Sequence, residues 1–187
     1  NQLDYDLKNE FGYYVGGGTI HNKEERSTVT SNQGYYYPNT ESFFFKDSVH
    51  LKHPDYDIRA DTMKFHSKSE TTYFLGPTHI KTGGNTIYCE KGKLNPKTKT
   101  SYFVKNASIS SNEKVIKGDS IFYNQQNKIG EVFDNVTIID TAENLIINGD
   151  YSKYNEADST SVVTGNVLLT QIYEKDTFYL HADTLLS

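Results

Sequence analysis

A repeating pattern of about 29 residues constrains this chain more than any other feature of its sequence. Its fixed point is an acidic or amide residue that follows a small residue. These anchor residues are Asn32, Asp61, Glu90, Asp119, Asp150 and Asp183, separated by 29, 29, 29, 31 and 33 residues. A period of this length is typical of solenoids and stacked β arrays.

Apolar residues recur at fixed distances from each anchor. Three places before it stand Val29, Ile58, Ile87, Ile116, Ile147 and Leu180. One place before it the residue is small: Ser31, Ala60, Cys89, Gly118, Gly149 and Ala182. Thirteen places after it stand Phe45, Phe74, Phe103, Val132 and Val163, and nineteen places after it Leu51, Ile80, Ile109, Ile138 and Leu169. Several columns agree at once, so the repeat is genuine.

The local pattern predicts β-strands. Val, Ile, Thr and aromatic residues form short alternating runs that Gly, Asn and Asp interrupt. No segment carries a sustained apolar stripe at helical spacing with caps. We therefore expect an all-β chain, a repetitive antiparallel jellyroll or solenoid-like roll of short stacked strands without significant helix.

The repeats define one domain over residues 1–187, with units that begin near residues 19, 48, 77, 106, 135 and 166. Residues 1–18 precede the first unit and end in Gly16-Gly17-Gly18, which we interpret as a flexible or tight-turn element. The last unit stops four residues after its anchor, where earlier units run fifteen. We expect the chain to be part of a longer protein.

The length variation lies on one side of the repeat. Leu51 and Ile58 are seven positions apart but Leu169 and Leu180 are eleven apart, whereas in each of the five complete units the anchor lies fifteen residues before the unit ends. One edge of the stack should therefore carry turns of variable length and the other turns of fixed length. We interpret Asp47-Ser48, Gly76-Pro77, Asp134-Asn135 and Gly165-Asn166 as corners of the fixed side. The small residue and the anchor should mark a bulge, because the flanking apolar columns cannot share one face of a straight strand.

The acidic anchors are candidate structural residues: Asp61, Glu90, Asp119, Asp150 and Asp183. A ladder of carboxylates does not converge as a metal site requires, so we expect them to accept backbone N–H bonds at the bend. His50 and His79 lack a third ligand for zinc. The sequence contains no pattern of catalytic residues, and we expect neither enzyme activity nor a metal or cofactor.

Composition excludes other classes of function. The net charge is −5, which disfavours nucleic acid as a partner, and no apolar run approaches the roughly 18 residues of a membrane span. The small residues directly before the anchors are called the small column below. The single cysteine, Cys89, belongs to this column and is expected to be a buried small residue.

The motifs resemble a known family. Residues 164–171, Thr-Gly-Asn-Val-Leu-Leu-Thr-Gln, are followed by His181-Ala-Asp-Thr-Leu185, and this arrangement is similar to the repeat of OstA-like lipopolysaccharide-transport proteins. Gly118–Tyr123 and Gly149–Tyr154 match the second half of that unit, and Ala60–Phe65 matches more loosely. Glu90 and Gly92 depart from the pattern. The resemblance covers roughly residues 48–187.

The resemblance implies a β-jellyroll that carries lipopolysaccharide through the periplasm, with its signal peptide removed. Lipid A acyl chains would occupy an apolar groove, and exposed edge strands would pair with similar proteins or with further copies, head to tail. The candidate groove residues are Leu51, Ile58, Met63, Phe65, Phe74, Ile80, Ile87, Phe103, Ile109, Ile116, Ile121, Tyr123, Ile138, Ile147, Tyr154, Leu169 and Leu180. Two alternatives remain open: a secreted or surface β-solenoid that binds or cleaves polysaccharide, and a structural module that assembles end to end.

Overall fold

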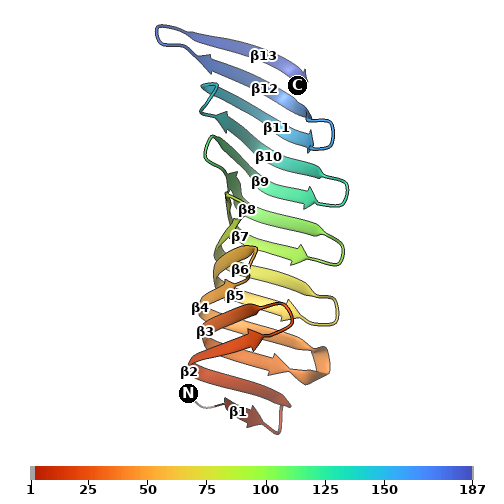
Figure 1. Cartoon of the computed structure of the whole chain (residues 1–187). Helices are drawn as coiled ribbons and strands as arrows, with labels where there is room; N and C mark the ends of the chain where they lie inside the picture. The colour runs from red at the N-terminus through yellow and green to blue at the C-terminus, as the bar shows by residue number, and fades with distance from the viewer. Residues whose placement is uncertain (1–2, 187) are drawn as a thin grey trace.

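The computed structural model describes residues 3–186 and places almost all of them in one antiparallel β-sheet. Within residues 3–186, thirteen strands pair in chain order, so that each strand is hydrogen-bonded to its sequence neighbours in the sheet (Figure 1). The first seven strands are β1 (Leu3–Asp6), β2 (Phe11–Asn22), β3 (Ser27–Tyr37), β4 (Ser42–Lys52), β5 (Tyr56–His66), β6 (Thr71–Thr82) and β7 (Asn85–Asn95). The other six are β8 (Thr100–Ser110), β9 (Lys114–Asn124), β10 (Ile129–Asp140), β11 (Leu145–Asn155), β12 (Thr160–Ile172) and β13 (Thr177–Leu186).

The all-β prediction is confirmed. One 3-10 turn, η1 (Pro38–Thr40), is the only helical element among residues 3–186, and none of the elements described there is a helix that could cross a membrane. The strands are longer than expected: each repeat contributes two strands, mostly of 11 or 12 residues, rather than several short ones.

Most of these long strands bend at an interruption in their pairing. In β10 the register shifts between Phe133 and Val136, where Asp134 and Asn135 adopt positive φ angles of 57° and 52°. Asp47 and Ser48 occupy the same place in β4, and Gly165 and Asn166 in β12. A bulge of this kind bends its strand and increases the local twist.

The interpretation of these residue pairs as corners was therefore wrong. They lie in the middle of strands, not between them, and the repeat boundaries drawn from the sequence cut through β4, β6, β8, β10 and β12. Gly16 and Gly17, with φ angles of 79° and 98°, likewise form the bulge of β2 and not a separate turn. Residues 3–22 thus already follow the strand pattern of the repeats.

The bend divides the sheet into two arms. The first arm comprises the strand segments that meet at turns 7–10, 38–41, 67–70, 96–99, 125–128 and 156–159, all of four residues. The second arm ends at turns 23–26, 53–55, 83–84, 111–113, 141–144 and 173–176, which vary from two to four residues. The structure therefore has one edge of fixed and one of variable turn length, as the repeat spacing predicts.

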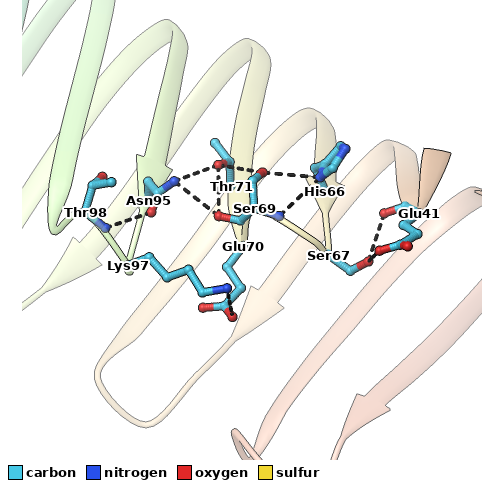
Figure 2. A network of polar contacts seen from close by, with 9 residues as sticks. All are labelled: Glu41, His66, Ser67, Ser69, Glu70, Thr71, Asn95, Lys97 and Thr98. Atoms are coloured by element: carbon cyan, nitrogen blue, oxygen red, sulfur yellow. Dashed lines mark hydrogen bonds and ion pairs between the residues drawn. The ribbon is translucent and has the colours of Figure 1, made fainter.

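Consecutive turns of the first arm bind one another (Figure 2). The Ser67 backbone N–H donates to the Glu41 carbonyl oxygen at 3.0 Å, and the Gln125 N–H donates to the Lys99 carbonyl oxygen at 2.9 Å. The side-chain amide of Asn95 donates to the Thr71 hydroxyl at 2.8 Å. These bonds extend the hydrogen-bond ladder of the sheet across its turns, and so they fix the spacing of this edge.

Candidate functional site

The concave face of the bent sheet holds the apolar interior. Inward side chains from both arms belong to one core cluster, which runs from Phe45 in β4 to Val136 in β10. Next to the bend, Phe45, Phe74 and Phe103 are 4%, 0% and 2% exposed. Their cross-strand partners include Met63 and Ile121, which are also buried.

The small column explains how the bend packs. A Cβ atom built at Gly118 would lie 2.4 Å from a methyl carbon of Val132, and one at Gly149 would lie 2.6 Å from a methyl carbon of Val163. Larger side chains therefore do not fit at these positions without displacement. The prediction for Cys89 also holds: the residue is completely buried, and burial raises the pKa of its thiol to about 12.

The candidate groove residues separate into three groups by exposure. The buried ones are Leu51, Ile58, Met63, Phe74, Ile80, Phe103 and Ile121. The half-buried ones are Phe65, Ile87, Ile109, Ile116, Tyr123, Ile138, Ile147 and Leu169. Tyr154 and Leu180 are exposed, by 43% and 40%.

These groups follow the length of the molecule. In the column three places before the anchor, exposure rises from 1% at Ile58 through half-buried Ile87, Ile116 and Ile147 to 40% at Leu180. The column nineteen places after the anchor changes in the same way, from buried Leu51 to half-buried Leu169. The interior is thus closed and packed around β4–β6, whereas its apolar lining becomes accessible toward β13.

Sequence reasoning missed Tyr14 at the other end of the interior. Tyr14 precedes Gly18 by four residues, as Phe45 precedes Val49, so it continues the same column into β2. Its ring occupies the space that Gly18 and Gly34 leave open, since a Cβ at either glycine would lie within 2.4 Å of it. The Tyr14 hydroxyl lies 2.6 Å from the Ser31 hydroxyl, which satisfies both polar groups. The four-residue spacing was the signal that could have identified it.

The acidic anchors lie on the outer side of the bend. The side-chain amide of Asn135 donates to the Asp119 carboxylate at 3.0 Å, and Asn166 binds Asp150 in the same way at 2.9 Å. Asn106 donates to Glu90 at 2.7 Å. In these three cases the donors are side-chain amides from the bulge of the next strand, not the backbone N–H groups expected from the sequence.

The remaining two anchors differ. Asp61 packs against Gly76, where a Cβ would approach the Asp61 Cβ to 2.9 Å, and Asp183 is exposed on the last strand. Within residues 3–186, no group of three or more His, Cys, Asp or Glu side chains is arranged to hold a metal ion.

Both end strands of the sheet have one paired and one unpaired side. Within residues 3–186, β1 pairs only with β2, and β13 pairs only with β12. Apolar side chains at these ends are accessible: Leu3 is 78% exposed, Phe178 50% and Leu186 77%. Unpaired strand edges can add further strands from another chain.

This chain resembles known proteins in part of its sequence and in its fold. Residues 1–61 match the family model of OstA-like proteins. This segment lies mostly outside residues 48–187, where the motifs that resemble the same family were found. No curated protein matches the chain by sequence.

The fold is similar to that of LptH from Pseudomonas aeruginosa, described as the LptA-homologous periplasmic component of the conserved lipopolysaccharide transport device. The TM-score is 0.53 at 11% sequence identity, over 61% of this chain and 86% of LptH. At this identity the match shows a shared fold. Residues 1–61 thus resemble OstA-like proteins in sequence, and the chain shares its fold with an LptA homologue.

Proposed function

We propose that this chain is a lipopolysaccharide-transport module of the periplasm, and that acyl chains bind in the accessible part of its interior near β10–β13. The observation that carries the proposal is the apolar lining, which stays continuous while its exposure rises from Ile58 to Leu180. The OstA-like sequence match and the LptH-like fold support lipopolysaccharide as the ligand.

The energetics favour this end of the molecule. Each buried CH₂ group contributes about 0.8 kcal/mol, so a bound acyl chain needs exposed apolar surface that it can cover. Leu180 and Phe178 offer such surface, whereas Phe74 is already fully buried by protein atoms. Acyl chains would enter the closed interior around β4–β6 only by displacing packed side chains.

The unpaired edges of β1 and β13 fit the second part of the proposal. Pairing of β13 with the first strand of a similar module, or of another copy, would continue the sheet and cover the exposed lining. The proposed activity is carriage of a lipid and involves no catalytic step.

Site-specific photo-crosslinking tests the ligand and its location. Benzoylphenylalanine placed at Leu169 or Leu180 should label purified lipopolysaccharide, whereas placement at Thr170 or Tyr179, the next residues on the opposite face, should not. Phe103 should label weakly because its side chain is 2% exposed. The pair Ile116 and Lys117 provides an intermediate inward site and its outward control.

The packed centre favours one competing function, a structural module that spans a distance by end-to-end assembly. Equal labelling at inward and outward positions, together with concentration-dependent association of the chain, would support that scaffold and reject transport. Labelling confined to inward positions near β13 supports the transport proposal.

A further inference from the structure

The outer face of the first arm carries a row of alternating aromatic and lysine side chains. Phe44, Lys64, Tyr73, Lys93 and Tyr102 are directly opposed across the five strands β4–β8. We call these five residues the aromatic–lysine row. They point away from the interior, because they alternate with the inward residues of the same strands, such as Phe45 and Phe74.

The two tyrosines present the most available rings of this row. Tyr73 is 38% exposed and Tyr102 is half-buried. Within residues 3–186 no ring or cation contact occurs at either ring, whereas the Lys64 ammonium lies 5.2 Å from the centre of the Phe44 ring. Tyr73 and Tyr102 therefore offer flat surfaces on which another ring can stack.

The face is cationic on an acidic protein. The aromatic–lysine row and its neighbour toward the bend (Lys46, Thr62, Leu75, Lys91 and Val104) hold four lysines and no acidic residue. The chain as a whole has a net charge of −5. None of the four lysines forms an ion pair within the part of the chain that the structure describes. Two carboxylates at the bend, Glu90 and Asp119, border the same hollow as Tyr102, and each accepts a hydrogen bond from an asparagine side chain.

The spacing of the row identifies the kind of ligand. Neighbouring strands lie about 4.8 Å apart, so aromatic rings on every second strand stand roughly 9.6 Å apart, with a lysine between them. This distance is close to the length of a disaccharide unit in an extended polysaccharide. Pyranose rings stack their C–H faces on the electron-rich faces of aromatic side chains, and acidic sugars add a negative charge that lysine attracts.

We propose that this outer face binds a linear acidic polysaccharide, with pyranose rings on Tyr73 and Tyr102 and sugar acid groups at Lys93 and Lys64. Phe44 extends the same track once Lys64 turns toward the ligand. The inference concerns the opposite face of the sheet from the lipid-binding interior and does not depend on the proposed transport function.

Titration calorimetry of the full chain with alginate oligosaccharides, a linear polyuronate, tests this site. Dextran serves as the uncharged sugar and inorganic polyphosphate as the charged polymer without sugar rings. We expect alginate to bind and dextran not to. The double variant Tyr73→Ala/Tyr102→Ala should weaken alginate binding about tenfold, a loss of about 1.4 kcal/mol, because both stacking surfaces are removed.

Matched variants distinguish the loss of ring stacking and the loss of charge from a general loss of folding. Tyr88→Ala removes a half-buried tyrosine from the outer face of the second arm, where its ring contacts His79, and should leave alginate binding unchanged. Tyr73→Phe should retain affinity because the ring face remains. Lys93→Gln should weaken binding and reduce its salt dependence, whereas Lys117→Gln, an exposed lysine of the second arm, should not.

Four results would overturn the proposal. The first is that alginate fails to bind. The second is that polyphosphate binds as well as alginate while the tyrosine variants have no effect, which would leave only non-specific charge attraction. Anionic phospholipid vesicles compete alginate away and bind more tightly, which assigns the face to a membrane surface. Single-stranded oligothymidylate binds more tightly than alginate, which assigns it to nucleic acid. None of these results bears on crosslinking from Leu169 and Leu180, so the two proposals fail separately.

Discussion

Strands β4–β9 and β10–β13 are built from the same repeat but have different interiors. In the first region Phe45, Phe74 and Phe103 fill the space beside the bend, and Ile58 and Ile80 close the second arm over it. In the second region Val132 and Val163 replace the phenylalanines, and the last strand leaves Leu180 uncovered. Val132 and Val163 are themselves only 6% and 2% exposed, so the column beside the bend stays packed in both regions and the accessible lining lies along the second arm.

Truncation of core residues should give the largest contrast between the two regions. Phe74→Ala removes a fully buried ring and should lower the free energy of unfolding by about 3–5 kcal/mol. Leu180→Ala removes a side chain that is 40% exposed, so it should cost about 1 kcal/mol or less. Urea unfolding followed by circular dichroism and tyrosine fluorescence measures both. Equal losses would show that the last strand packs as tightly in solution as the centre.

Enlarging the small column should show that the bend itself is tight in both regions. Gly118→Leu places a side chain where its Cβ would lie 2.4 Å from Val132, and overpacking of this kind costs about 1–3 kcal/mol. Gly149→Leu should cost a similar amount because Val163 lies at 2.6 Å. Lys117→Leu, at the exposed neighbour, is the control. If the melting temperature of Gly118→Leu is unchanged, the described packing of the bend is incorrect.

The acidic anchors should contribute less to the free energy of unfolding than the buried apolar residues do, and the contribution should be equal in both regions. Asp119→Ala removes the acceptor for the Asn135 amide and should cost about 0.5–1.5 kcal/mol. Asp119→Asn retains an amide oxygen that can accept the same bond, so its cost should be smaller. Both variants are compared by urea midpoints with and without calcium. Stabilisation by calcium that disappears in Asp119→Asn would contradict the structural role and indicate a metal site.

Acidification should change the free energy of unfolding least, and it should do so by protonating carboxylates at the turns. Backbone N–H bonds from turn 141–144, followed by Lys114, hold the pKa of Asp140 below its usual value of 3.8, and the hydrogen bond from His50 lowers the pKa of Asp57. The folded pKa lies below the unfolded one, so this stabilisation is present above about pH 4 and is lost as the pH falls through the folded value.

The acid effect is checked by urea midpoints at pH 7, 4 and 2.5. Asp140→Asn should reduce the difference between the midpoints at pH 7 and pH 2.5, because the amide has no charge to lose. Asp140 pairs with Lys114 at 3.1 Å in the region of β9–β11, and Asp57 pairs with His50 at 2.8 Å in the packed region. A variant whose acid sensitivity matches the parent would show that other groups dominate the acid response.

The sequence predicted the inward columns because side-chain alternation in a strand has a period of two, which survives any error in where the strands begin. Ile58, Phe74 and Ile121 could be assigned to the interior for this reason, and all three are buried. The fixed and variable turn edges were predictable for a similar reason: insertions in a hairpin turn change the residue count without disturbing the columns.

Only the tertiary structure decided where the chain turns and where the interior is accessible. Pairs such as Asp134-Asn135 adopt the left-handed conformation in a mid-strand bulge as readily as in a hairpin turn, so their identity does not distinguish the two. Exposure of Leu180 likewise depends on strands that lie beside it, not on its own column. Composition and spacing determine which face a side chain takes, whereas the packing of distant segments determines how much of that face remains open to a ligand.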